Sequence, residues 1–315
     1  MDRCFFCGES LEATSSNGRW HRQCSKKFFG TEIPPIVSLS EHNLEAMAHK
    51  LIGEKITLPG VQKKLSLHLI EEKGQPPRLT IVDTPTGFIL KPQSPEFPQL
   101  PEAEDLVMRM ADAADIATVP HALLLLEDGT LAYITKRIDR EGKKRIAMED
   151  FCQLSEKLTE DKYKGSYEMC AKLIQTWSDR PLLDVTNFYY LLLFSFVTGN
   201  SDMHLKNFSL IADGSANHVL APAYDLLPVN LILKQESEET ALSLGGKKSK
   251  LSYKTFLELG IHLEIKEIVI HNLIKKLQNL EPVFMQIISA SFVSEKMKGD
   301  MRELVCERLQ RLSSE

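Results

Sequence analysis

The sequence of 315 residues lacks a long apolar run, an excess of positive charge and an N-terminal leader pattern. Its longest apolar stretch, residues 188–197, is interrupted by Ser195 and is about half as long as a membrane-spanning helix of roughly 20 residues. Aspartate and glutamate (43) outnumber lysine and arginine (38). A chain with this balance is not a general binder of nucleic acid or of anionic membrane. We therefore expect a cytoplasmic location and no membrane association.

Disulfide bonds are also not expected, because six cysteines in a chain without a leader pattern are typical of reduced thiols or metal ligands. Cys4 and Cys7 form a C-x2-C pair, and His21 and Cys24 form an H-x2-C pair. These ligand types at this spacing predict a closed, structural zinc site, in a segment with too few aliphatic residues to fold on its own core. The alternative is a set of scattered thiols beside a surface histidine.

Internal repeats and low-complexity tracts are missing, and 43% of the residues are hydrophobic, which is enough for a large core. Changes of pattern divide the chain into a Cys/His module (1–33), a strand-rich part with one embedded helix (34–140) and an almost wholly helical part (141–315). The predicted fold class is therefore α+β, with a small N-terminal module and two larger parts.

Periodicity places several elements within these parts. We expect strands near 65–69, 86–91, 131–136 and 208–212, and helices near 41–53, 101–114 and 184–198, the last of them buried on all sides. Trp177, Tyr189 and Tyr190 stand at helical spacing near apolar neighbours and are expected in the core. His68 and His121 are expected to be surface or core residues without a catalytic role.

The stretch from Gly199 to Ser209 carries the strongest chemical signal. Asp202 and Asn207 are five residues apart, as are the aspartate and asparagine of protein-kinase catalytic loops. There the aspartate accepts the proton of the attacking hydroxyl, and the asparagine holds a magnesium ion. Asp225 could supply the second carboxylate ligand that magnesium needs. The spacing alone is weak evidence, since Asp and Asn are common in turns, but the loop also follows an apolar helix.

A lysine and a glutamate upstream fit the same chemistry. Lys91 ends the predicted strand FILK, where a kinase places the lysine that binds ATP phosphates and pairs with a helix glutamate. On the following helix, Glu104 lies on the apolar face, whereas Glu102 shares its face with Asp105 and Arg109 and is expected to be solvated. We therefore choose Glu104 as the partner. The alternative is that Lys91 is a surface lysine, the commoner situation for a single lysine.

The segment from Thr57 to Ser66 is a weaker candidate for a phosphate-binding loop. It contains one glycine, so it is not the G-x-G-x-x-G loop of ordinary kinases. The backbone N–H groups of Gly60, Val61 and Gln62 could still surround a phosphate.

Several motifs together make the chain resemble the HipA family of bacterial serine/threonine kinase toxins. The matching segments are LPGVQKKLS (58–66), FILKP (88–92), PEAE (101–104), VPHALLL (119–125), YITKRIDR (133–140), MEDFCQL (148–154), GNSDMHLKNFS (199–209) and AYDLLPV (223–229). They occur in the order of the family and cover roughly residues 36–260. The resemblance implies a two-lobed kinase-like fold that uses ATP and magnesium to phosphorylate protein hydroxyls. Family targets are aminoacyl-tRNA synthetases, whose modification stops translation.

The resemblance also implies a role for individual residues. It makes Asp202 the catalytic base, Asn207 and Asp225 the magnesium ligands and Lys91 the ATP-phosphate ligand, and it places His204 and Lys206 near the transferred phosphate. Backbone groups of residues 133–140 would meet the adenine, with Arg137 and Asp139 bracing that stretch.

Two departures from the family pattern have consequences. The segment before Thr57 is too short for the β-rich subdomain that begins full-length members, so the chain is similar to the short toxins of three-gene systems. We therefore expect a small partner protein that supplies this subdomain, and a helix-turn-helix antitoxin through which DNA is reached only indirectly. The resemblance places Thr57, by register, at the position where family members autophosphorylate, but Pro59 stands where the serine-rich version of this loop has a second serine, so one site could remain or regulation could differ.

Two other functions remain open from the sequence. A phosphoinositide-kinase-like or small-molecule phosphotransferase also fits, because Asp202, His204 and Asn207 form an Asp-x-His-x-x-Asn pattern, although no basic segment near the loop favours a lipid surface. A catalytically silent module that assembles with an antitoxin on DNA is the other alternative. The intact set of Lys91, Glu104, Asp202, Asn207 and Asp225 is evidence against it.

Overall fold

The computed structural model describes residues 2–11, 19–37, 64–82, 86–142, 144–233 and 237–313. The predicted helix at 41–53 and the predicted phosphate-binding loop with Thr57, Gly60, Val61 and Gln62 lie outside these described residues. The chain forms two compact units. Unit 1 comprises residues 1–105 and 119–145, and unit 2 comprises residues 106–118 and 146–315.

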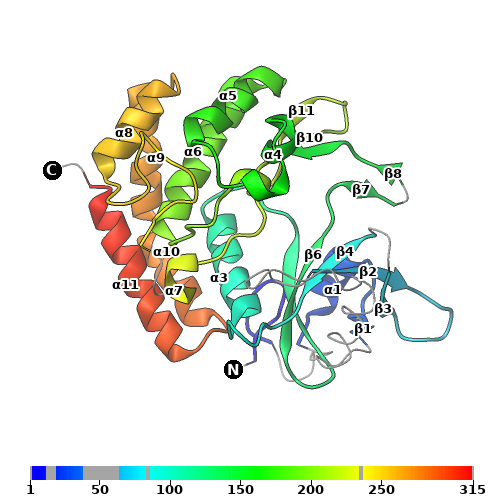
Figure 1. Ribbon diagram of the computed structural model, residues 1–315. Coiled ribbons are helices and arrows are strands. Elements are labelled where there is room, and N and C mark those ends of the chain that lie inside the picture. The colour runs from blue at the N-terminus through cyan, green and yellow to red at the C-terminus, as the bar shows by residue number, and fades with distance from the viewer. Residues whose placement is uncertain are drawn as a thin grey trace. The chain divides into compact units, whose positions relative to one another are not determined.

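A six-stranded sheet is the framework of unit 1 (Figure 1). Its strands lie in the order β1-β3-β2-β4-β6-β5, and neighbours are antiparallel except β1 and β3. The strands predicted near 65–69, 86–91 and 131–136 are confirmed as β2, β4 and β6, whereas β1 and β3 were not predicted. The bounds are β1 (Ile36–Val37), β2 (Leu65–Ile70), β3 (Arg78–Ile81), β4 (Phe88–Lys91), β5 (His121–Leu125) and β6 (Leu131–Lys136).

Strand β4 lies inside this sheet, between β2 and β6, and its alternation gives its two faces different environments. Phe88 packs on the aromatic rings of the N-terminal module, whereas Lys91 points to the other face and is 2% exposed. Helix α3 (Leu100–Ala113) begins in unit 1 and confirms the predicted helix that starts near Pro101. The strand therefore carries a buried lysine at its end.

The N-terminal module packs on this sheet through aromatic side chains. Helix α1 (Arg22–Phe29) ends at Gly30, whose φ of 90° is the left-handed conformation that favours glycine at a helix end. The ring of Phe28 lies 5.7 Å from Trp20 and 5.8 Å from Phe88, centroid to centroid. A backbone hydrogen bond of 3.1 Å from Leu123 N–H to the Phe5 carbonyl joins the module to β5.

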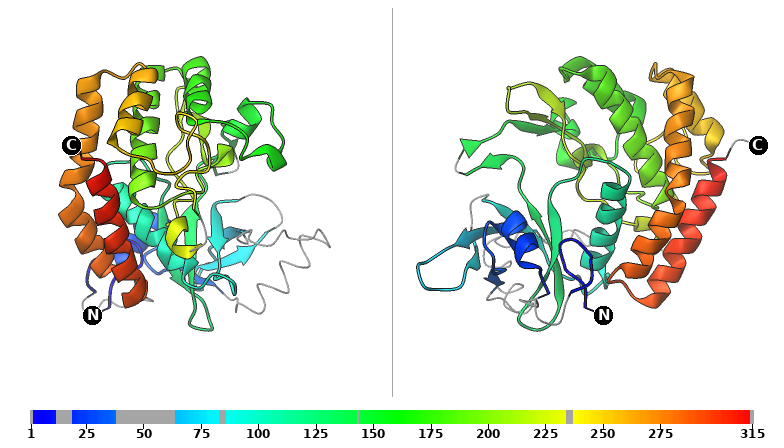
Figure 2. Two further views of the ribbon diagram at one scale, coloured as in Figure 1. Left: turned by 60° about the vertical axis from the view of Figure 1, so that its left-hand side comes forward. Right: turned by 180° about the vertical axis from the view of Figure 1, so that it is seen from behind.

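Unit 2 is built around helix α6 (Pro181–Val197), which packs against α5, α9 and α11 (Figures 1 and 2). The helix predicted over 184–198 is confirmed and is buried throughout residues 188–197, but Asn187 is exposed and the helix begins earlier than predicted, at Pro181. Tyr189 and Tyr190 are buried as expected. Trp177 is 56% exposed, so its predicted place in the core is wrong. It is the last residue of α5, where the helix no longer covers it.

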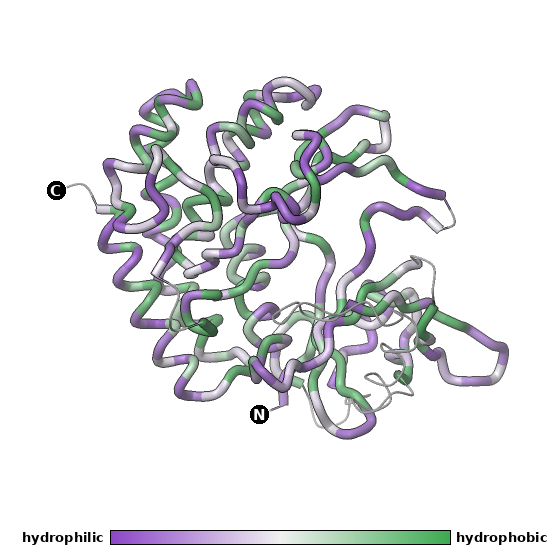
Figure 3. The backbone as a smooth tube through the Cα atoms, viewed as in Figure 1, coloured by the Kyte–Doolittle hydropathy of each residue, from purple (hydrophilic) through white to green (hydrophobic). Residues whose placement is uncertain are grey.

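The remaining helices of unit 2 bury different shares of their surface. Helix α11, for example, carries both hydrophilic and hydrophobic residues along its length (Figure 3) and buries Met301, Val305 and Leu309. The bounds of these helices are α4 (Phe151–Leu154), η1 (Thr159–Asp161), α5 (Tyr167–Trp177), η2 (Leu205–Asn207), α7 (Val229–Ile232), α8 (Tyr253–His262), α9 (Glu267–Asn279), α10 (Glu281–Ala290) and α11 (Glu295–Arg311).

Unit 2 also holds a three-stranded sheet in the order β11-β10-β9, so the prediction of an almost wholly helical second half is incomplete. The strands are β9 (Met148–Asp150), β10 (Ser209–Ala212) and β11 (His218–Leu220), and only β10 was expected. Three residues are too few to show a period of two. A two-stranded hairpin of β7 (Arg140–Glu141) and β8 (Lys144–Arg145) belongs to unit 1.

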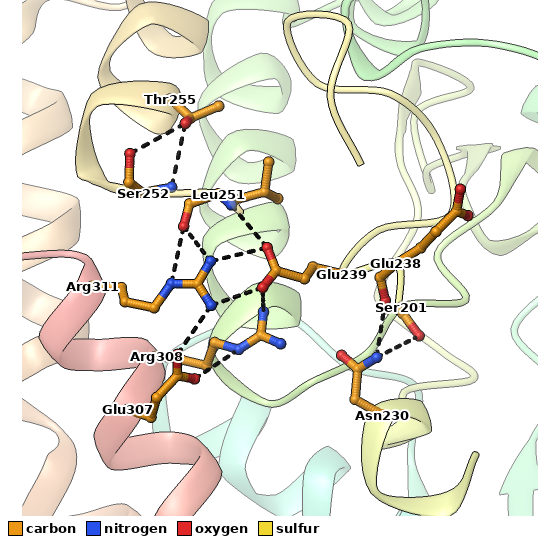
Figure 4. A network of polar contacts seen from close by, with 10 residues as sticks. All are labelled: Ser201, Asn230, Glu238, Glu239, Leu251, Ser252, Thr255, Glu307, Arg308 and Arg311. Atoms are coloured by element: carbon orange, nitrogen blue, oxygen red, sulfur yellow. Dashed lines mark hydrogen bonds and ion pairs between the residues drawn. The ribbon is translucent and has the colours of Figure 1, made fainter. Parts of the chain in front are cut away.

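A charged network fixes the C-terminal helix α11 to the segment that precedes α8 (Figure 4). The Glu239 carboxylate accepts hydrogen bonds of 2.7 and 3.0 Å from Arg311 and one of 2.8 Å from the Leu251 N–H. Arg308 lies 3.3 Å from the same carboxylate, and Arg311 also donates to the Leu251 carbonyl. Three chain segments thus share one carboxylate.

Candidate active site

The loop with the predicted catalytic residues begins at Gly199, directly after helix α6. Gly199 has a φ of 68°, and a Cβ at this position would lie 2.6 Å from Leu304 Cδ2. The left-handed backbone conformation therefore favours glycine, and a larger residue would also have to displace the Leu304 methyl group. The chain can turn sharply here from a buried helix into the loop that leads to β10.

The backbone holds this loop in one conformation. The Asp202 carbonyl accepts 2.8 Å from the His204 N–H and 2.9 Å from the Asn207 side-chain amide, Nδ2. The hydroxyl of the buried Tyr167 also donates a hydrogen bond of 3.1 Å to the Met203 carbonyl in this loop. The structure thus brings Asp202 and Asn207 together, in a loop with few remaining degrees of freedom.

The Asp202 carboxylate is accessible and has two different neighbours. Its side chain is 44% exposed, and its Oδ1 accepts a hydrogen bond of 2.7 Å from the Tyr163 hydroxyl. Its Oδ2 lies 4.0 Å from His204 Nε2. Burial lowers the pKa of His204, against the charges of Asp202 and Asp225, which raise it. The imidazole therefore favours the neutral form beside the carboxylate.

Asn207 and Asp225 both offer oxygen atoms suited to magnesium. Because the N–H2 side of the Asn207 amide is bonded to the Asp202 carbonyl, a cation would meet the amide oxygen. Asp225 has a φ of 57°, a strained conformation that aspartate tolerates better than most residues and that is found at functional sites. The preceding Tyr224 bonds to Ser209 at 2.6 Å, which anchors the segment to β10.

Lys206 is paired with a residue to which the sequence analysis assigned no role. Its Nζ lies 3.0 Å from Asp150 Oδ2. Asp150 also caps helix α4, because its other oxygen accepts 2.9 Å from the Gln153 N–H and the Gln153 side chain accepts from the Asp150 N–H. The D-x-x-Q pattern of this capping box is visible in MEDFCQL and could have located the helix start. It carries no signal for the contact with Lys206.

In unit 1, the structure brings Lys91 and Glu104 into a buried ion pair. Lys91 Nζ lies 2.5 Å from Glu104 Oε1, with side-chain exposures of 2% and 0%. The Tyr133 ring, from the register neighbour on β6, has its centroid 5.3 Å from the same Nζ. The alternative of a surface lysine is therefore wrong.

The expectation that Glu102 is solvated is also wrong. Glu102 is 8% exposed and accepts hydrogen bonds of 2.9 and 3.0 Å from the Gln93 amide, while burial raises its pKa. Asp105 on the same helix face is 1% exposed and lies 3.7 Å from His121. A helical pattern shows which face is apolar, but it does not show that the polar face is covered as well.

Arg137 and Asp139 form a bidentate pair in the stretch that follows β6. Arg137 donates 2.8 Å from Nε and 2.7 Å from Nη2 to the two carboxylate oxygens. Burial would raise the pKa of Asp139, but the Arg137 bonds and the charges of Arg137 and Arg140 hold it below its usual value. This stretch is therefore rigidly braced; its contact with adenine stays a prediction.

The four predicted zinc ligands form one cluster. The ligand atoms of Cys4, Cys7, His21 and Cys24 all lie within 4.8 Å of one another. His21 Nδ1 is 3.4 Å from Cys7 Sγ and 3.7 Å from Cys24 Sγ, while its Nε2 is 3.3 Å from the Ser10 carbonyl. A proton on Nε2 would satisfy that carbonyl and leave Nδ1 as the ligand, the usual arrangement at metal-bound histidines. The donor set of three sulfurs and one nitrogen fits Zn²⁺.

Sequence comparison identifies the family. Residues 56–284 match the HipA-like C-terminal domain model, so the chain belongs to the HipA-like C-terminal domain family. It is 31% identical over 230 residues to "Putative kinase Y4dM" of Sinorhizobium fredii, covering 68% of this chain and 55% of that protein. It is 26% identical over 317 residues to a "Putative kinase" of Haemophilus influenzae, covering 91% of this chain and 89% of that protein. The chain thus spans about half the length of the first of these relatives.

The solved structures confirm the fold. The HipA, HipB and operator DNA complex of the Shewanella oneidensis MR-1 toxin–antitoxin system contains a chain that matches with a TM-score of 0.65 and 18% identity, over 82% of this chain and 65% of that chain. The protein therefore has the α+β, two-lobed, kinase-like fold of this family, here with an N-terminal Cys/His module. Within the described ranges, every helix is too short or too polar to cross a membrane.

Proposed function

We propose that this protein is an ATP-dependent serine/threonine protein kinase and the toxin of a toxin–antitoxin system. The observation that carries the proposal is the loop in which an accessible Asp202 carboxylate stands beside an Asn207 amide held by the Asp202 carbonyl. In this role Asp202 accepts the proton of the acceptor hydroxyl, and the amide oxygen of Asn207 faces a cation. The family membership and the kinase-like fold support the same reading.

Other residues bind and orient in this proposal. Lys91, held by Glu104, binds ATP phosphate, and Arg137 and Asp139 brace the backbone that meets the adenine. Asn207 and Asp225 hold Mg²⁺, which neutralises phosphate charge when bound. His204 and Lys206 lie on the same loop as Asp202 and contact the transferred phosphate. Gly60, Val61 and Gln62 cover the phosphates.

The proposed substrate is a translation-related protein such as an aminoacyl-tRNA synthetase, and the proposed result is growth arrest in the cytoplasm. Expression of the wild-type chain should arrest growth, and Asp202→Asn should relieve the arrest. Phosphoproteomics of the two strains should then show serine or threonine sites that are present only with the wild type. Phosphorylated lipid or small molecules, with no new protein sites, would instead identify another class of phosphotransferase.

Thr57 is the proposed autophosphorylation site. A phosphate dianion there would repel the phosphates of ATP and move the loop from the nucleotide. Intact-mass measurement after incubation with ATP and magnesium should show one added phosphate, and Thr57→Ala should abolish it. Phosphate that is still added to Thr57→Ala would contradict the assignment.

The proposed partners are a helix-turn-helix antitoxin and a small protein that supplies the β-rich subdomain. The Shewanella HipA chain is in a complex with HipB and operator DNA. This supports the proposal that an antitoxin binds DNA and links the kinase to it. Affinity purification of the tagged chain from its own host should recover both partners. Recovery of neither, at native expression, would refute this part of the proposal.

The Cys/His cluster is proposed to hold one structural zinc ion. Metal analysis should find about one zinc per chain, and Cys7→Ser should lose it, because three ligands bind zinc more weakly than four. Cys306→Ser is the matched control, since Cys306 is also exposed but belongs to unit 2. Because the module packs on Phe88 of β4, loss of zinc should also lower the melting temperature of the protein.

A further inference from the structure

The hydroxyl group of Tyr163 makes a contact with the proposed catalytic base that the sequence did not suggest. Its Oη lies 2.7 Å from Asp202 Oδ1, across 39 residues of sequence. Its ring meets the His204 imidazole edge to face, with centroids 5.1 Å apart and an interplanar angle of 78°. We propose that Tyr163 is a positioning residue, which sets the orientation of the Asp202 carboxylate for proton transfer. This inference rests on the proposed kinase function.

The segment around Tyr163 is fixed to the catalytic loop by its backbone. The Lys162 carbonyl accepts a hydrogen bond of 3.1 Å from the Leu205 N–H, one residue after His204. On the other side, the Lys164 carbonyl accepts from Lys157 Nζ, and the Lys164 N–H donates 2.8 Å to the Asp161 carbonyl. The phenol is therefore presented to Asp202 from a braced turn and is not a side chain on a free loop.

The two carboxylate oxygens of Asp202 have different neighbours and, in this proposal, different roles. Oδ1 receives the phenol hydrogen, and Oδ2, 4.0 Å from His204 Nε2, remains for a second donor. A carboxylate that is 44% exposed would otherwise rotate about its last torsion and expose either oxygen. A fixed Oδ2 meets the acceptor hydroxyl in one orientation, which reduces the reorganisation needed before proton transfer.

If Tyr163 were instead an inhibitory residue, the effect of its removal on the reaction rate would be reversed. If the phenol occupied the place of the acceptor hydroxyl, its removal would speed the reaction. Because a carboxylate oxygen has two lone pairs and the Asp202 side chain is 44% exposed, the phenol and an acceptor hydroxyl can bind Asp202 together. We therefore expect a loss of rate on removal of the phenol hydroxyl.

The test measures release of ADP from Mg-ATP with water as the acceptor. Tyr163→Phe should lower kcat roughly 10-fold, as expected when a hydrogen bond to a charged catalytic group is lost. The KM for ATP and the melting temperature should change little, because Tyr163 is 45% exposed and Tyr163→Phe keeps the ring that packs on His204. Tyr253→Phe is the matched control, since the Tyr253 ring also packs on a histidine, His271, and its hydroxyl makes a hydrogen bond of 2.8 Å to that histidine, away from the catalytic loop.

A second comparison separates positioning from a general structural effect. In the Asp202→Asn background, Tyr163→Phe should cause no further fall in kcat, because the residue acts through the carboxylate. The proposal would be overturned if Tyr163→Phe lowered kcat equally in the wild type and in Asp202→Asn. It would also be overturned if Tyr163→Phe alone left kcat unchanged or raised it. A wild-type chain that releases no ADP would refute the kinase function itself, and this inference with it.

Discussion

Lys91 and Glu104 are the residues whose burial most needs an explanation. Taking a lysine and a glutamate to exposures of 2% and 0% costs several kcal/mol per ion before their attraction is counted. Apolar residues of similar size would give a fold at least as stable. The pair is therefore better explained by a function that needs a fixed ammonium group than by stability.

Removing one partner should be more harmful than removing both. Lys91→Met should lower the free energy of unfolding by about 3 kcal/mol, because Glu104 would be left as an uncompensated buried charge. Lys91→Met with Glu104→Leu should recover most of that loss, yet neither variant should bind Mg-ATP. Urea unfolding and nucleotide titration measure the two effects separately.

The control for this experiment is an exposed pair in the same unit. Arg78 and Glu72 lie 2.8 Å apart with side-chain exposures of 48% and 47%, so Arg78→Met should change stability by less than about 1 kcal/mol. A double variant that binds Mg-ATP as well as the wild type does would remove the functional explanation of the pair.

The sequence predicted individual site residues only where the chemistry follows a local pattern. Glu104 was chosen correctly as the partner of Lys91 because it lies on the apolar face of a helix. Glu102 was misjudged because its partner, Gln93, comes from outside that helix. Tyr163 could not be found at all, because no spacing rule links it to Asp202 across 39 residues.

At the scale of elements, length decided what could be predicted. Strand β2 alternates apolar and polar residues over positions 65–69, β6 follows a recognisable Asp-Gly turn, and helix α6 is apolar over several turns, so all three could be recognised. Strands β9 and β11 have three residues each, and their pairing with β10 depends on tertiary contacts. The loop between α6 and β10 was located correctly because both of its neighbours were recognisable.

The stability that the contact between helix α11 and Glu239 gives to the fold should depend on pH. Burial raises the pKa of Glu239. Hydrogen bonds from Arg311 and the Leu251 N–H, together with the charges of Arg308 and Arg311, lower it by more, so the pKa lies below its usual value. A group with a lowered pKa stabilises the fold above its unfolded value, about 4.3, and loses this effect as the pH falls through the folded value.

Glu239→Gln should therefore cost about 2 kcal/mol near pH 7 and progressively less below pH 4. Guanidinium unfolding at several pH values, followed by circular dichroism, measures the difference. Glu258→Gln is the control, because the pair of Glu258 with Lys254 at 3.9 Å is exposed, and the effect of this variant on stability should stay near zero at every pH. A cost at Glu239 that is constant from pH 7 to pH 3 would show that the carboxylate charge is not what holds α11.

At the scale of the whole molecule, the family match and the structure divide the chain differently. The match covers residues 56–284, so the Cys/His module and helix α11 lie outside it. Both are nevertheless bound to matched segments, the module through Phe28 and Phe88 and α11 through Arg311 and Glu239. The sequence predicted the first of these regions as a metal module, but its motifs contained no information about either contact, because both join residues far apart in the chain.

Binding of Mg-ATP should stabilise the whole protein in a way that depends on Asp225. A ligand at 100 times its Kd adds about 2.7 kcal/mol to the free energy of unfolding, which is a rise of several degrees in Tm for a chain of this size. Asp225→Asn should abolish most of this rise, because the neutral amide binds magnesium more weakly than the carboxylate.

Asp115→Asn is a close control. Asp115 also has a φ of 57°, is 79% exposed and pairs with Lys276, so backbone strain is matched while the proposed metal site is untouched. Equal stabilisation of both variants by Mg-ATP would show that Asp225 does not hold the metal, and a loss of stabilisation in both would trace the effect to the strained backbone instead of the carboxylate.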